Sequence, residues 1–99
     1  MSEVSEMMAS IKKKIPVCEL MAGLAEEASE LAQAALKLRR VWDQTNPTPK
    51  KEEEAIEDLF EEIADVYLYV YVVGIPVDNI KKITYVKLQR WKNRLEGKA

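Results

Sequence analysis

The chain has 99 residues, of which 47% are hydrophobic and 32% are charged, with a formal net charge of −2. These values suit one domain spanning residues 1–99, and a domain this small is expected to gain stability by associating with other copies. Because the sequence has no histidine, one cysteine and three glycines, it excludes Ser-His-Asp triads, zinc sites built from histidine or cysteine, and glycine-rich phosphate loops.

The first half of the sequence predicts two helices. Apolar side chains recur at helical spacing over residues 3–13, which indicates a short amphipathic helix. Pro16 is well placed to open a second helix that extends to Asp43. The prolines and polar residues of "DQTNPTP" then predict a loop, with Thr48 as the N-cap of the next helix.

A third helix is predicted from Pro49 to Val73, and a fourth after it. The end of the third, "VYLYVYVV", is rich in residues that favour strands, but the helical pattern before it is not interrupted. A helix that is apolar on all sides is a buried one, so we expect this segment at the centre of a bundle or dimer. Gly74 ends it, and Asp78 is predicted to cap the fourth helix, which Gly97 ends. The predicted fold is therefore an all-α bundle of one short and three longer helices, completed by oligomerisation.

Charge is distributed unevenly along the chain. Residues 52–65 carry eight acids and no base, whereas residues 81–98 carry seven Lys or Arg and one Glu. This asymmetry predicts internal charge pairing or a bound anion.

No secretory hydrophobic segment follows the acidic start "MSEVSEMM" and no apolar run is long enough to span a membrane, so we expect a cytoplasmic protein in which Cys18 is a small buried residue.

Carboxylates interrupt the apolar stripes of the second and third predicted helices. The stripe of the second helix consists of Leu20, Leu24, Leu31 and Leu38. Glu27 lies on this stripe and Glu30 follows one turn later; Glu62 and Asp65 repeat the spacing on the third helix. If the two helices pack antiparallel, the four carboxylates face one another, and their repulsion calls for a divalent cation. In a chain without histidine, oxygen ligands favour Mg²⁺, with Mn²⁺ as a substitute.

A plainer interpretation of the same residues is a solvated helix face. Glutamate is a good helix former, and each doublet, Glu26-Glu27 and Glu61-Glu62, places one acid near the apolar side by geometry alone. The metal hypothesis gains weight because both helices share the spacing and the interruption of the stripe.

The two motifs, "EEASE" at residues 26–30 and "EEIAD" at residues 61–65, resemble the EExxE…ExxD signature of the MazG-like, all-α nucleoside triphosphate pyrophosphohydrolases. The resemblance implies Mg²⁺-dependent hydrolysis of (d)NTPs to (d)NMPs and pyrophosphate, in homodimers or dimers of dimers whose helices bundle across the interface. Carried over by position, the implied metal ligands are Glu27, Glu30, Glu62 and Asp65, and the candidates for activating water are Glu26 and Glu61. The connection between the motifs, which includes "VWDQTNPTPKKEEE", is longer than in many members and is interpreted as a solvated loop.

The fourth predicted helix carries cations beside its apolar face. Three cations, Lys87, Arg90 and Arg94, share one side of this helix with Trp91. They are suited to binding a triphosphate, whose negative charge a metal ion neutralises only in part. "KLQRWKNR" also resembles the family's C-terminal phosphate-binding stretch. The alternative is that these cations extend from a bundle helix and pair with nearby acids. Tyr69 and Trp91 are the candidates for contacting the nucleobase, although such aromatic residues are more often part of a core or an interface.

The sequence thus predicts a Mg²⁺-dependent nucleotide pyrophosphatase that cleans or controls the nucleotide pool. The first alternative is a non-enzymatic helical oligomerisation or interaction module, in which the acids are a solvated face or a docking surface. A second is RNA binding by the basic helix with Trp91 and Tyr85. The acidic third helix and the net charge of −2 argue against nucleic acid as a partner.

Overall fold

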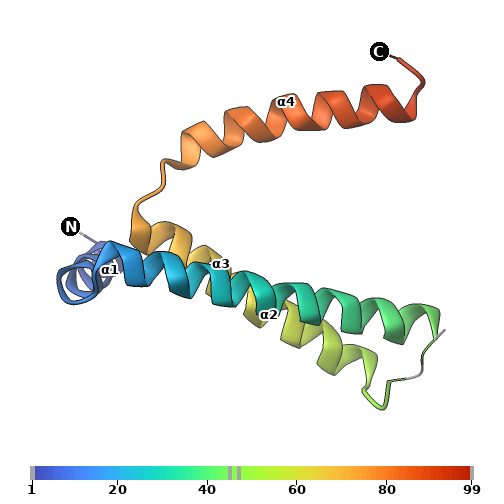
Figure 1. The fold of residues 1–99 in the computed structure, drawn as a ribbon, viewed down its shortest axis with the longest axis horizontal. Coiled ribbons are helices and arrows are strands. Elements are labelled where there is room, and N and C mark those ends of the chain that lie inside the picture. Colours follow the sequence, from blue (N-terminus) through green and yellow to red (C-terminus); the bar gives the residue numbers. More distant parts are fainter. Residues whose placement is uncertain (1, 45, 47, 99) are drawn as a thin grey trace.

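The structure is a computed structural model that describes residues 2–44, 46 and 48–98. It consists of helices, with no strand among those residues, in the chain order shown in Figure 1. The helices are α1 (Glu3–Lys14), α2 (Val17–Asp43), α3 (Glu52–Val73) and α4 (Val77–Leu95). The all-α fold class predicted from the sequence is confirmed, and so is the helical state of "VYLYVYVV".

The centre of the structure is an antiparallel hairpin of α2 and α3, the most extensive helix–helix contact in the protein. Its core residues are Leu20 and Leu38 of α2 and Ala55 and Val72 of α3, each at most 3% exposed. Burying leucine and valine side chains contributes roughly 1.5–3 kcal/mol each. The leucine stripe predicted from the sequence is therefore the face of α2 that packs on α3.

Polar contacts join α2 and α3 at the loop end of the hairpin. Trp42 Nε1 donates a hydrogen bond to Glu52 Oε1 at 3.3 Å, which joins the end of α2 to the start of α3. Gln44 takes the left-handed conformation at φ 54° and closes α2 with a backbone bond to Arg40 O. These contacts fix the end of α2 against the start of α3.

Two predicted helix starts were wrong. The third helix begins at Glu52, after an N-cap at Lys51, because the Thr48 hydroxyl donates backward to Asn46 O at 3.4 Å and caps no helix. The fourth begins at Val77 after Pro76, which places Asp78 inside the first turn, where its charge favours the helix dipole without a capping hydrogen bond. The predicted stops hold: Gly74 and Gly97 adopt left-handed φ values of 88° and 73°.

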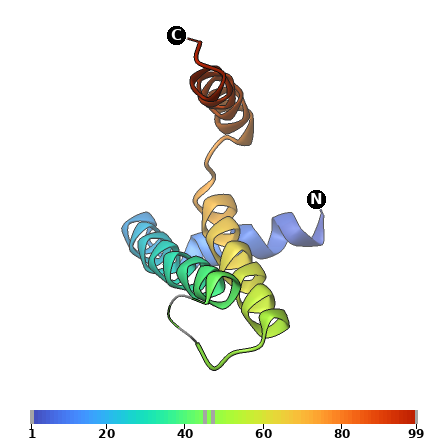
Figure 2. The same ribbon diagram turned by 90° about the vertical axis from the view of Figure 1, so that its right-hand side faces the viewer.

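The short helix α1 packs on α3 and runs across the hairpin (Figure 2). Ile11 and Ile15 line a small apolar pocket of about 230 Å³ with Leu20, Tyr69 and others. Cys18, expected to be buried, is exposed. It lies in the first turn of α2 on the side turned away from the leucine stripe, so the general tendency of cysteine towards burial does not apply here.

The fourth helix stands apart from the hairpin in both views (Figures 1 and 2). No residue of α4 is buried, although it carries a full apolar face. The "VYLYVYVV" segment beside it is also open: of its residues only Val72 is buried, while Tyr67, Leu68 and Tyr71 are at least half exposed. Within one chain, therefore, this segment is not the centre of a bundle. Among the described residues, no helix is both long and apolar enough to cross a membrane.

Candidate metal centre

The predicted carboxylates lie at the middle of the α2–α3 hairpin, and the register of the hairpin determines which of them meet. Gly23 of α2 lies against Tyr69 of α3, so closely that a Cβ atom on Gly23 would be 2.4 Å from the tyrosine ring. Because the helices are antiparallel, one turn forward on α2 is matched by one turn backward on α3. Glu27 therefore faces Asp65, as the spacing of the two motifs predicts.

Three carboxylates converge at this point. Glu27, Glu62 and Asp65 each offer one oxygen atom, and these oxygens all lie within 4.8 Å of one another. All three residues are half-buried at the interface of the two helices. A group of this size and composition has the donor type and spacing that hard divalent cations use.

The electrostatics of the three acids show how unfavourable the group is by itself. Burial, together with the charges of Asp65, Glu62 and Glu30, raises the pKa of Glu27. Burial and the charges of Asp65 and Glu30 likewise raise the pKa of Glu62, against a hydrogen bond from Glu27 that lowers it. Like charges in a partly desolvated site favour retention of a proton, and a cation would remove that need.

One oxygen of the group has no partner. The Oε2 atom of Glu62 is buried and has no hydrogen bond with any residue that the structure describes. A buried acceptor left unsatisfied is unfavourable, and such atoms in native proteins usually meet water or an ion. The residues present therefore fit a divalent cation. Their donors are hard oxygens, they converge from two helices, and one buried oxygen has no hydrogen-bond partner.

The other acids of the two motifs surround this group without joining it. Glu30, predicted as a fourth ligand, is exposed and lies outside the 4.8 Å group, although its charge acts on Glu27 and Glu62. Glu26 and Glu61, predicted to activate water, are exposed on the outer sides of their helices. The charge of Glu61 contributes to the raised pKa of Glu62, which places Glu61 close to the group.

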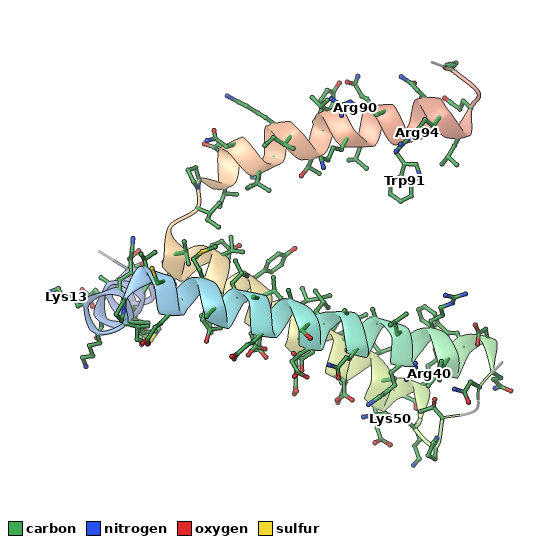
Figure 3. All side chains as sticks on the ribbon, in the orientation of Figure 1. Lys13, Arg40, Lys50, Arg90, Trp91 and Arg94 are labelled. Atoms are coloured by element: carbon green, nitrogen blue, oxygen red, sulfur yellow. The ribbon has the colours of Figure 1, made fainter. Side chains whose placement is uncertain are left out.

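The predicted phosphate-binding cations are not brought to the acids within one chain. Lys87, Arg90 and Arg94 are exposed on α4, which does not pack along the hairpin. Figure 3 labels Arg90 and Arg94 on this separate helix, with Trp91 extending from the side that faces the hairpin. Trp91 is 59% exposed, whereas Tyr69, the other predicted nucleobase contact, packs on Gly23.

A cation that the sequence analysis did not single out does lie beside the acids. Lys37 of α2 lines a polar pocket of about 270 Å³ together with Glu30, Asp58 and Glu62. It follows Glu30 by seven residues, the spacing that keeps two residues on one side of a helix. That spacing was the available signal, but Lys13 and Lys50 also follow an acid by seven residues, so it did not single out Lys37.

Comparison with known proteins gives no match for this chain, whether with family models, with curated proteins or with solved structures.

Proposed function

We propose that this protein is a Mg²⁺-dependent nucleoside triphosphate pyrophosphohydrolase, which converts (d)NTPs to (d)NMPs and pyrophosphate and so controls the nucleotide pool of the cytoplasm. The observation that carries the proposal is the convergence of Glu27, Glu62 and Asp65 around an unpaired buried oxygen. Their hard oxygen donors suit Mg²⁺, with Mn²⁺ as a substitute. The resemblance of "EEASE" and "EEIAD" to the MazG-like motifs supports the same activity.

The division of labour among the acids follows from their positions. Glu27, Glu62 and Asp65 would hold the ion, and Glu30 would join them from the next turn of α2. When bound, Mg²⁺ would neutralise phosphate charge and orient the triphosphate. Binding would also offset the repulsion among the carboxylates that raises the pKa values of Glu27 and Glu62.

Glu61 is the favoured general base. It is exposed to water and its charge reaches Glu62, whereas Glu26 holds the corresponding place on α2 and is the alternative. In the proposed reaction, Glu61 takes a proton from a water whose oxygen bonds to the α-phosphorus. The bond from that phosphorus to its bridging oxygen breaks, and pyrophosphate leaves with the electron pair.

The apolar face of α4 is proposed as the surface that associates with a second copy. Ile83, Leu88, Trp91 and Leu95 are each more than half exposed there, and the adjoining end of α3 is exposed as well. Helices in proteins gain most of their stability by packing an apolar face, and the apolar face of α4 is not covered within one chain. The cations of α4 also complement the acids of α3, which favours a homodimer or a dimer of dimers.

That assembly would complete the substrate site. If α4 of one copy lay along the hairpin of the other, Lys87, Arg90 and Arg94 would approach the phosphates. Trp91 would then be available to the nucleobase. Tyr69, the other candidate, would contribute through its ring edge beside Gly23, one turn from the acids.

Release of pyrophosphate from a panel of NTPs and dNTPs, with Mg²⁺ and with EDTA, tests the proposal. Wild type should release pyrophosphate, and not orthophosphate, only with the metal. Glu62→Gln should lower the rate by at least about 10-fold, because it weakens the metal site that the reaction needs. Glu53→Gln, an exposed acid at the start of the same helix, is the matched control and should retain the wild-type rate.

The alternative function, a non-enzymatic helical interaction module, is favoured by the open apolar face of α4. It predicts no pyrophosphate from any nucleotide and no effect of metal on the thermal midpoint. It also predicts that Glu62→Gln makes the protein more stable, since the substitution removes one of the repelling charges. That combination of results would overturn the proposed enzyme.

A further inference from the structure

The polar pocket beside the acids contains the elements of a phosphate site within a single chain. Its volume is about 270 Å³, and it lies in the groove between α2 and α3. Glu30 and Glu62 connect it with the candidate metal centre, and Asp58 lies at its other side. Lys37 is the cation among its lining residues.

The position of Lys37 is defined by the helix that carries it. Seven residues separate it from Glu30, which corresponds to a rise of about 10 Å along the axis. Helical side chains lean towards the N-terminus of their helix, so the lysine stem shortens this separation from the acids. Lys37 is half-buried, and it forms no ion pair with any acid in the part of the chain that the structure describes. Its ammonium group is thus available to a ligand.

The neighbouring acid Asp58 is engaged elsewhere. It pairs with Lys50, and the hydrogen bond with Asp58 raises the pKa of Lys50. Lys50 lines a second polar pocket with Arg40, nearer the loop end of the hairpin (Figure 3). Asp58 is thus paired with a cation that lines another pocket, which leaves Lys37 as the cation among the residues that line the first one.

We propose that Lys37 binds the β- and γ-phosphates of the nucleoside triphosphate, the part that leaves as pyrophosphate. This inference rests on the proposed function, because it takes the acids as the site of the α-phosphate. A triphosphate extended from the acids along the groove places its terminal phosphates towards Lys37. The ammonium group binds phosphate as a point charge, and its attraction increases as negative charge develops on the leaving group.

Two measurements on Lys37→Met, which keeps the aliphatic stem and removes the charge, test the inference. The first is steady-state pyrophosphate release, where kcat/KM should fall roughly 10- to 100-fold, the value expected for loss of one charge-assisted contact. The second is calorimetric binding of inorganic pyrophosphate with Mg²⁺, where the Kd should rise by a similar factor. Lys37→Arg should retain most of both.

The matched control is Arg39→Ala, which removes a cation two residues away on the same helix. The Arg39 side chain is 76% exposed and pairs with Asp43, outside the pocket. It should leave kcat/KM and pyrophosphate affinity unchanged. The rise in thermal midpoint caused by Mn²⁺ should persist in Lys37→Met, which would show that the fold and the acids are intact.

Each outcome has a distinct meaning. Unchanged kcat/KM and unchanged pyrophosphate affinity in Lys37→Met, with an active wild type, would overturn the role of Lys37 and leave the proposed function standing. A fall in stability alone would assign Lys37 to neutralising the acids and would likewise overturn it. A wild type that is inactive on every nucleotide and does not bind pyrophosphate would overturn both.

Discussion

The α2–α3 hairpin and α4 are both amphipathic, but only the hairpin buries its apolar face. All four core side chains belong to α2 and α3, whereas α4 has no buried residue. Leu38 in the hairpin is 3% exposed, and Leu88 on α4 is 56% exposed. The contrast shows that helical periodicity identifies a face that needs a partner without identifying the partner.

Replacing one leucine by alanine in each region should give the largest difference in the free energy of unfolding. Leu38→Ala is expected to lower the free energy of unfolding by about 2–5 kcal/mol, since it opens a cavity in a packed core. Leu88→Ala should change the stability of a monomer by less than about 0.5 kcal/mol. Chemical denaturation at several protein concentrations measures both. A large effect of Leu88→Ala that grows with concentration would show that a second copy covers α4, whereas a small effect of Leu38→Ala would contradict the hairpin core.

Gly23→Ala should be the next most damaging change. The new Cβ atom would lie 2.4 Å from the ring of Tyr69, and overpacking of this kind costs roughly 1–3 kcal/mol. In a Tyr69→Ala background the sign should reverse, because alanine is favoured over glycine within a helix by about 0.5–1 kcal/mol. Thermal unfolding of the single and double variants checks this. Equal effects in both backgrounds would show that Gly23 and Tyr69 do not touch.

Glu27→Gln should have a smaller effect, and one that depends on pH. Burial and the nearby acids raise the pKa of Glu27 above its ordinary 4.5, so the folded state holds this proton more tightly than the unfolded state. The contribution of Glu27 to stability therefore falls as pH rises from 4.5 through the raised pKa. In EDTA at neutral pH, Glu27→Gln should unfold at a higher temperature than wild type, and the difference should shrink as pH approaches 4.5.

Mn²⁺ should reverse that order. The ion should raise the thermal midpoint of wild type by binding the folded state, and raise that of Glu27→Gln much less. Glu53→Gln, which leaves the three acids intact, is the control and should respond like wild type. Wild type and Glu27→Gln unfolding together at every pH, with and without Mn²⁺, would contradict the assigned electrostatics.

The smallest effects are expected from ion pairs that remain open to solvent at least in part. The hairpin pair Lys50–Asp58 should contribute no more than about 1 kcal/mol, and the Lys92–Glu96 pair within α4 about 0.3–0.5 kcal/mol. Double-mutant cycles with Lys→Met and acid→amide changes measure each coupling, and both should weaken in high salt. A coupling of several kcal/mol for Lys50–Asp58 would mean that it is part of the fold and not a surface contact.

Much of the hairpin could be predicted from the sequence, because one pattern fixes both its helices and its packed face. The leucines of α2 predicted that face, and Glu27 on the same stripe predicted the acidic group at its centre. Matching motif spacing on α3 then predicted Glu62 and Asp65 as neighbours. That Glu30 lies outside the group of three acids could not be predicted, because this depends on how far its side chain reaches across the interface and not on its position along the helix.

The arrangement of α4 and the position of Lys37 could not be predicted. Periodicity placed Lys87 and its neighbours on one side of α4, but nothing local sets the direction in which α4 leaves Gly74. Lys37 looked like one of many solvated lysines until the register of α2 on α3 placed it beside Glu62. In both cases the missing information is tertiary: which helix face meets which, and at what offset.

Direct titration of Mn²⁺, followed by its electron paramagnetic resonance signal, tests the central claim most directly. Wild type and Glu53→Gln should bind Mn²⁺ at a saturable site, and Mg²⁺ should displace it. Glu62→Gln, folded and otherwise unchanged, should bind Mn²⁺ at least about 10-fold more weakly, because the substitution removes one of the three carboxylates that hold the ion. Equal Mn²⁺ binding by all three proteins, or none by wild type, would contradict a metal centre at Glu27, Glu62 and Asp65.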